Sequence, residues 1–416
     1  MAVFQAFYQP MNQFTKRIIL SLFVLLPSCL PLVIPAQSNT SPLKTQDSTT
    51  TPPGKIWGYV FGDYYFKAHS DSAGRGGTNQ YTGIPQNRNA FQIRRIYLGY
   101  NYAINPSFST ELLLAAEDNI TNTTGTTTGD LLSDNKLSFY VKLVNLRWKN
   151  IWKGTDLVIG QAPTPAFSLL TEQIWGYRSI EKTISDIRKT PSYDFGAMLQ
   201  GKFDPADGKF GYNLMIGNGT GAKPENDNFK WFYGEVYAKL FDKKIILDAY
   251  ADYERLNWIP GFHHSRNMLK GFIAYQTPAF TFGTEAFINH GQNDVAGIKA
   301  SQRDTLSADA TGISVYVKGQ ITPKKLGYFA RFDSYNPDTH YNQNYTSYQG
   351  FSANYEPNNK EKFITAGFDY TPSINIHFMP NIWYNSYKAQ QSNLSGAANH
   401  DHDLVFRITF FYIYDK

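Results

Sequence analysis

The chain has 416 residues, of which 18% are charged and 16% aromatic, and its formal net charge is +5. A mean hydropathy of −0.40 excludes a bundle of transmembrane helices, which would need long apolar stretches. The single cysteine excludes a disulfide framework. The near balance of basic and acidic residues gives no argument for a nucleic-acid partner.

Residues 1–36 are predicted to be a secretory signal peptide. Two basic residues precede the apolar run Ile18–Leu26, which is too short to span a membrane. Ala36 offers a small residue for cleavage, and the Ser-, Thr- and Pro-rich residues 37–53 then form a flexible periplasmic tether. Lipidation of Cys29 stays open as the less favoured alternative, because the residues before it match a lipoprotein cleavage site poorly.

The remaining residues show the pattern of β-strands with one apolar face. In 404–414 the even positions are apolar or aromatic, whereas Arg407 and Thr409 occupy odd positions. Successive side chains of a strand point to opposite faces, so one face of this strand is wholly apolar. The stretches 229–241 and 243–257 repeat the alternation. Because no helices are predicted to cover the apolar face, this pattern is typical of a transmembrane barrel.

About sixteen strand-like segments follow one another, and their connections alternate in length. Short turns such as Thr277-Pro278 alternate with long polar loops such as 291–309. We therefore predict an all-β fold over 54–416, a transmembrane antiparallel β-barrel of about 16 strands with short periplasmic turns and long extracellular loops. Sixteen strands enclose more space than wall side chains fill, so we expect a water-filled interior.

The adjacent pair Arg94-Arg95 tests this model, because strict alternation gives one of the two arginines the lipid-facing parity. The parity of Ile96 and Leu98 places Arg95 in the lumen. Arg94 is then expected near the outer rim, where a lipid-facing arginine costs about 0–1 kcal/mol instead of about 2–4 kcal/mol at mid-bilayer.

The loop 162–192 joins the fifth and sixth predicted strands and carries apolar residues at rough helical spacing. Apolar residues at this spacing are not typical of a loop that is fully exposed to water. We therefore expect the loop to fold into the barrel as a constriction loop. Alternatively, the loop lies over the mouth of the barrel or forms a contact between subunits. Its charged residues, the candidates for setting selectivity, are Glu172, Arg178, Glu181, Lys182, Asp186, Arg188 and Lys189.

Charged residues with lumen parity occur on many of the predicted strands. Their mixed signs indicate a transverse field across a pore, and the plainer alternative is that many of them pair along the wall. The lumen-lining candidates are Arg95, Glu111, Lys142, Lys202, Glu235, Lys239, Asp248, Asp252, Lys318, Arg331 and Arg407.

No metal, cofactor or catalytic site is predicted. The histidines of His263-His264 and of 400–403 lack the spacing of an established metal site and are interpreted as solvated loop residues. The Gly-x-Ser-x-Gly motif is absent, and no convincing lipid-facing Ser–His pair emerges. An enzyme is therefore not expected.

Four short segments carry a resemblance to a known family. Phe91–Gly99, Ile159–Pro165, Asp194–Gly201 and Tyr212–Gly219 resemble the phosphate-selective porin O and P family, especially its Bacteroidetes-type members. The lysine-rich phosphate ladder of that family has no residue-by-residue counterpart in this chain. The resemblance implies a porin in the cell outer membrane, in contact with lipid and lipopolysaccharide, with a homotrimer expected.

The residue pattern and the resemblance together predict that the protein allows passive diffusion of small hydrophilic solutes or ions. A slight positive excess on the constriction loop favours a weak preference for anions, phosphate-like ones included. The alternatives are a barrel-shaped surface adhesin or scaffold and, less favoured, an outer-membrane enzyme.

Overall fold

The computed structural model describes residues 54–76, 80–117, 137–188, 191–225, 227–256, 263–345, 347–350 and 356–415. The predicted signal peptide and tether, and the candidate Lys189, lie outside these ranges.

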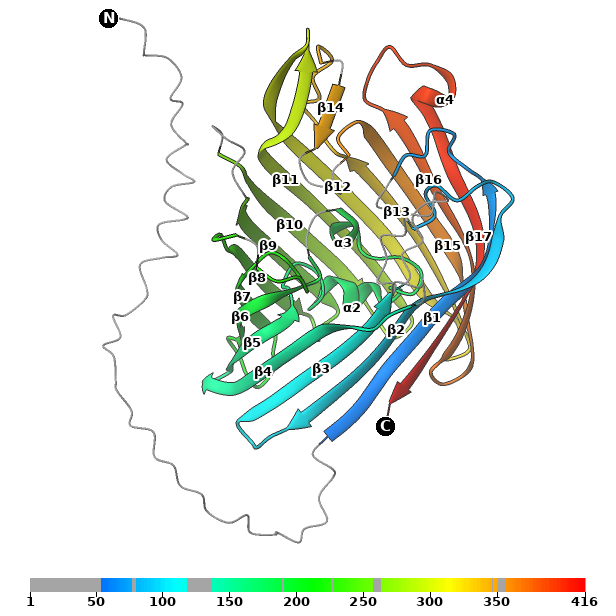
Figure 1. Cartoon of the computed structure of the whole chain (residues 1–416). Helices are drawn as coiled ribbons and strands as arrows, with labels where there is room; N and C mark the ends of the chain where they lie inside the picture. The colour runs from blue at the N-terminus through cyan, green and yellow to red at the C-terminus, as the bar shows by residue number, and fades with distance from the viewer. Residues whose placement is uncertain are drawn as a thin grey trace, which may run out of the picture. The chain divides into compact units, whose positions relative to one another are not determined.

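Long antiparallel strands make up most of the described chain (Figure 1). The strands are β1 (Gly54–His69), β2 (Asn89–Ala103), β3 (Phe108–Glu117), β4 (Tyr140–Trp152), β5 (Thr155–Pro163), β6 (Tyr193–Lys202), β7 (Phe210–Gly217), β8 (Trp231–Leu240), β9 (Ile245–Arg255), β10 (Ser265–Gln276), β11 (Phe280–Lys299), β12 (Gln302–Thr322), β13 (Leu326–Asn336), β14 (Ser347–Gly350), β15 (Asn359–Ser373), β16 (Ile376–Ala389) and β17 (His400–Asp415). The described helices are short: α2 (Thr171–Trp175), α3 (Ile184–Arg188) and α4 (Gly396–Asn399). No helix among these residues is long and apolar enough to cross a membrane.

Within the described residues, sixteen of the strands close into a ring. Each strand from β1 to β13 pairs with the next, β13 pairs with β15, and β15 to β17 continue the order. The seam between β1 and β17 runs from Trp57 opposite Asp415 to His69 opposite Leu404 and completes the ring. The predicted antiparallel barrel of sixteen strands is confirmed, and closure leaves no ring strand with an unpaired edge.

The alternation read from the sequence decides which side chains face outward. On β17, Phe406 and Ile408 are 49% and 51% exposed, whereas Arg407 between them is 3% exposed. β8 and β9 follow the same rule, with Val236 and Leu247 outside. The wall is therefore apolar outside and polar inside, the inverse of a water-soluble sheet protein.

The expectation for Arg94 is wrong, because the strand is not regular at this point. A β-bulge places Arg95 opposite Phe61 and Ile93 opposite Gly62, which leaves Arg94 without a partner residue on β1. One extra residue turns both arginines to the same side of the sheet. Arg94 and Arg95 are accordingly both buried inside the barrel, and no arginine of this pair faces outward.

The prediction of a long polar loop over 291–309 is also wrong. β11 and β12 continue beyond the wall as one hairpin, with only Ala300 and Ser301 between them. β14, which lies in the next long connection, pairs with Val295–Ile298 of this extension. In this extension Val295 and Ala308 are buried against Tyr348 of β14, so its apolar face is covered by a strand that lies elsewhere in the sequence.

Candidate functional site

The constriction loop between β5 and β6 begins and ends at adjacent points of the wall. The backbone N–H of Thr164 donates to the carbonyl oxygen of Ser192 at 3.1 Å, and Ser168 Oγ donates to the same oxygen at 2.9 Å. α2 and α3, which this loop carries, lie within the ring of strands (Figure 1). The predicted infolding is confirmed.

Apolar side chains of the loop pack against the inner wall on the far side of the ring. The buried ring of Trp175 lies 4.9 Å from the ring centre of Tyr316 on β12 and 6.4 Å from that of Phe329 on β13. Ile184 of α3 joins a second buried cluster, which includes Phe287 of β11. The interior is therefore partly packed by the loop, so water fills less of the lumen than the number of strands alone indicates.

Three wall arginines fix the path of the loop by donating to its backbone carbonyl oxygens. Arg407 Nη2 donates to the oxygen of Ile180 at 3.0 Å, and Arg331 Nη1 donates to that of Lys182. Arg94, the residue at the bulge of β2, donates to the backbone carbonyl oxygen of Ser179. Buried cations at loop carbonyls position the loop, so these arginines are not mobile charges of an open lumen.

The loop's own charges are largely neutralised by neighbours. Arg178 forms ion pairs with both Glu172 and Asp186 of the same loop. Arg188 binds Glu361 of β15 through two parallel hydrogen bonds of 2.9 and 2.7 Å. Glu361 was not among the candidates, although its inward parity on β15 could have suggested it.

Glu181 serves the loop as an anchor. Its Oε2 accepts a hydrogen bond of 2.9 Å from the indole Nε1 of Trp383 on β16, and its Oε1 accepts one of 3.0 Å from the backbone N–H of Lys182. The indole partner was missed by sequence reasoning, because nothing in the sequence links residues two hundred positions apart.

Lys182 differs from the other described charges of the loop. Among the described residues, no carboxylate oxygen lies within the 4.0 Å of an ion pair from its Nζ, and the side chain is partly exposed. Burial within the barrel lowers the pKa of Lys182, and the cations Arg95 and Arg178 act in the same direction while Asp186 opposes them. Lys182 is thus a partly exposed cation of the infolded loop.

Charged groups of the near wall surround this lysine. Glu117 of β3 pairs with Lys142 at 2.6 Å and lies 3.5 Å from Arg95 Nε. Lys142 Nζ also lies over the ring of Tyr97, 4.9 Å from its centre. We define the constriction cluster as the four cations and three carboxylates that interact around the loop: Arg95, Lys142, Arg178, Lys182, Glu117, Glu172 and Asp186.

The predicted acidic residues of β8 and β9 are buried and hydrogen-bonded in the wall. Asp248 pairs with Lys270 at 2.6 Å, and both side chains are fully buried. Glu235 accepts from the amide of Asn213 on β7, and Asp252 accepts from the backbone N–H of Met268 on β10 at 2.7 Å. These groups hold adjacent strands together and lie apart from the constriction cluster.

The other lumen candidates are spread over different heights of the wall. Glu111 accepts a hydrogen bond of 3.1 Å from Asn145, Lys239 lies 5.2 Å from the ring centre of Tyr237, and Lys202 is exposed where β6 ends. Arg331 forms an ion pair with Asp333.

Lys318 of β12 faces a cavity of about 340 Å³ under the constriction loop. Tyr177, Asp369 and His377 also line this cavity, and Lys318 Nζ lies 5.6 Å from the ring centre of Tyr177. Among the described residues, no carboxylate lies within 4.0 Å of this ammonium group. A second accessible cation therefore lies on the short-turn side of the loop.

Comparison with known proteins identifies relatives of the fold. No protein-family model and no curated protein sequence matches the chain. Among solved structures, the outer membrane channel DcaP of Acinetobacter baumannii has a TM-score of 0.59 at 11% identity, covering 89% of this chain and 100% of that one.

Two further structures agree with this fold. OmpF of Salmonella typhi, solved with daunomycin, has a TM-score of 0.54 at 11% identity and covers 87% of this chain and 97% of its own. The anion-selective porin from Comamonas acidovorans has a TM-score of 0.53 at 9% identity and covers 87% and 99%. At these identities the likeness concerns the fold alone.

Proposed function

We propose that this chain is an outer-membrane porin through which small hydrophilic solutes diffuse passively, with a weak preference for anions. The observation that carries the proposal is a closed barrel, apolar outside and charged inside, whose interior is narrowed by a loop that presents Lys182. The likeness in fold to outer-membrane channels and porins supports the same assignment.

The preference for anions rests on unpaired cations. Lys182 in the constriction and Lys318 below it lack carboxylate partners among the described residues, whereas most other inward charges are paired. An ion in a narrow, poorly hydrated passage feels such a charge more strongly than it would in bulk water. Phosphate-like anions, which the sequence resemblance suggests, are included in this proposal as one solute class.

Planar-bilayer recording tests the function directly. Folded protein should give stepwise, ohmic currents, and a salt gradient should give a reversal potential of the sign expected for anions. In the double variant K182Q/K318Q the reversal potential should shift toward cation preference. Lys223→Gln, which removes an exposed lysine in the connection between β7 and β8, is the control and should leave the reversal potential unchanged.

The rival functions predict a different outcome of the same experiment. A surface adhesin or scaffold, or an outer-membrane enzyme, does not need to conduct ions. Persistent silence from protein that is demonstrably folded would therefore reject the porin and favour these rivals. Our proposal includes no enzymatic activity.

We further propose that the barrel functions as a homotrimer embedded in outer-membrane lipid and lipopolysaccharide. The belt of outward apolar side chains, with Phe406 and Ile408 among them, supports contact with lipid. Mass determination of the detergent-solubilised protein tests the trimer, and a monomer mass in several detergents would reject it.

A further inference from the structure

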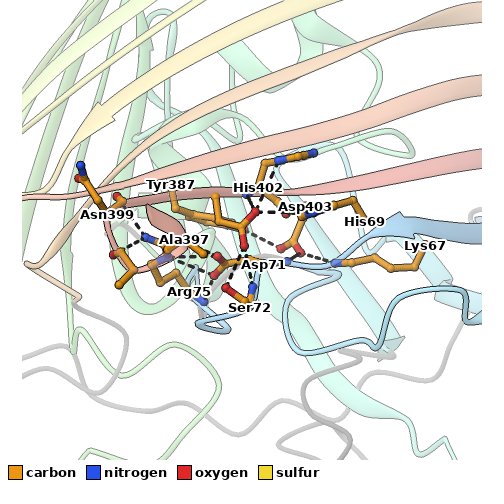
Figure 2. Close-up of polar contacts among 12 residues, drawn as sticks. Lys67, His69, Asp71, Ser72, Arg75, Tyr387, Ala397, Asn399, His402 and Asp403 are labelled. Carbon is orange, nitrogen blue, oxygen red and sulfur yellow. Dashed lines mark hydrogen bonds and ion pairs between the residues drawn. The ribbon is translucent and has the colours of Figure 1, made fainter. Parts of the chain in front are cut away.

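A cluster of metal-binding side chain types lies at the long-loop end of the barrel seam, where β1 ends and β17 begins. His69 comes from the end of β1, and Asp401 and His402 come from the start of β17. One potential ligand atom of each of the three residues lies within 4.8 Å of the others. Figure 2 shows the two histidines beside the polar network that joins these strands.

Asp401 is held so that one of its carboxylate oxygens points toward the histidines. Its Oδ2 accepts hydrogen bonds of 2.9 Å from both the backbone N–H and the Oγ of Ser72. Its Oδ1 lies 3.7 Å from His69 Nε2 and 3.7 Å from His402 Nδ1. The carboxylate therefore has a fixed orientation and a shared oxygen between two imidazoles.

The hydrogen bond of His69 fixes its tautomer. Its Nδ1 lies 2.8 Å from the carbonyl oxygen of His402, and because a carbonyl oxygen only accepts, Nδ1 carries the hydrogen. The lone pair is then on Nε2, the nitrogen that faces Asp401. A backbone carbonyl that binds the distal N–H is the usual second partner of a metal-binding histidine.

Ion pairs and hydrogen bonds hold the surrounding seam, which favours a preformed site. Lys67 and Asp403, both fully buried, form an ion pair of 2.6 Å beside the two histidines (Figure 2). Arg75 pairs with Asp71 at 2.6 Å and donates to the carbonyl oxygen of Ala397 at 2.9 Å, which ties the segment after β1 to α4. A supported shell of this kind lowers the cost of bringing ligands together.

We propose that His69, Asp401 and His402 bind one divalent cation of the zinc and copper class. Two imidazole nitrogens and one carboxylate oxygen suit Zn²⁺ and Cu²⁺ better than Mg²⁺ or Ca²⁺, which prefer oxygen ligands. Ligands about 2.1 Å from a tetrahedral ion lie about 3.4 Å apart. The two carboxylate-to-imidazole separations of 3.7 Å need to close by a few tenths of an ångström, and the two imidazole nitrogens, which lie within 4.8 Å of each other, must also approach.

Binding also requires one change in ring orientation. The rings of His69 and His402 are stacked, with their centres 4.0 Å apart and an interplanar angle of 7°. An imidazole binds a metal in its own plane, so one ring must tilt out of the stack. Their side chains are 36% and 30% exposed, which leaves room for this rotation and for a water ligand. The bound ion would link β1, the first strand of the barrel, to β17, the last.

The test uses full-length folded protein without a polyhistidine tag and Zn²⁺ or Cu²⁺ as the probe. Titration calorimetry should find one Zn²⁺ site per chain, and the Cu²⁺ electron paramagnetic resonance spectrum should show coupling to nitrogen. In His69→Gln and Asp401→Asn the affinity should fall at least tenfold. Heat-modifiable migration on gels confirms that each variant still forms a barrel.

His340→Gln is the matched control. His340 and His290 bind different oxygens of Asp309, at 2.9 and 2.6 Å, so this control also removes a histidine beside a carboxylate. It should leave the affinity unchanged, and Zn²⁺ should raise the unfolding temperature of the wild type but not of His69→Gln. Equal binding by the wild type and a folded His69→Gln variant would overturn the proposal, as would absence of a stoichiometric site in the wild type.

Discussion

Arg94 of β2 and Asp63 of β1 form an ion pair of 2.6 Å inside the barrel, with side chains only 3% and 0% exposed. The pair exists because the bulge in β2 turns Arg94 inward, opposite to the direction that strict alternation gives. Asp63 also accepts hydrogen bonds of 2.6 Å from Tyr81 Oη and Thr409 Oγ1. A single irregular residue thus connects β1, β2, β17 and, through Ser179, the constriction loop.

Replacing Arg94 by Met should destabilise the barrel strongly. The substitution leaves Asp63 buried without its nearest cation, and loss of one partner of a buried ion pair costs about 3–5 kcal/mol. Arg147→Met is the control, because the Arg147–Asp156 pair of 3.0 Å is partly exposed and should contribute no more than about 1 kcal/mol. Reversible urea unfolding in detergent or liposomes measures both, and equal losses would contradict the buried pair's importance.

The preference for anions should fall as pH rises. Lys182 is charged below its pKa, and burial lowers that pKa, so its charge is lost at a lower pH than that of an ordinary lysine. The reversal potential in a salt gradient should therefore move toward cation preference in the alkaline range. Lys182→Gln should reduce this movement, and an identical pH profile in the variant would show that another group is responsible.

Shortening the constriction loop should widen the passage. Because Thr164 and Ser192 already meet at the base of the loop, deletion of 168–188 with a short Gly-Ser linker can leave the barrel wall intact. Removal of Trp175 and of the four loop members of the constriction cluster, Glu172, Arg178, Lys182 and Asp186, should raise single-channel conductance and weaken ion selectivity. Unchanged conductance and selectivity in a folded deletion variant would mean that ions pass without meeting this loop.

Cysteine labelling can distinguish the inside of the barrel from the outside. In a Cys29→Ser background, Lys182→Cys should react with a small charged thiol reagent supplied in water, since Lys182 is partly exposed within the barrel. Phe406→Cys, on the outward face of β17, should stay unreactive in a membrane. Similar labelling of both positions in intact liposomes would contradict the assignment of faces.

The sequence by itself was enough to predict the strands of the barrel wall and which of their side chains face outward. A strand turns each successive side chain to the opposite face, so composition at alternate positions is enough to assign Phe406 outward and Arg407 inward. Turn residues and polar stretches mark most strand ends for the same local reason. The amphipathic centre of the constriction loop also predicted its infolding, because its apolar residues need a surface to cover.

Only the tertiary structure decided where the pattern breaks and which distant residues meet. The bulge at Arg94 depends on the register against β1, which a single strand does not encode locally. Ring closure brings His69 beside His402, and the infolded loop brings Arg188 to Glu361 and leaves Lys182 without a carboxylate partner among the described residues. These relationships arise from packing between segments that are distant in the sequence, whereas alternation reports only the local geometry of each strand.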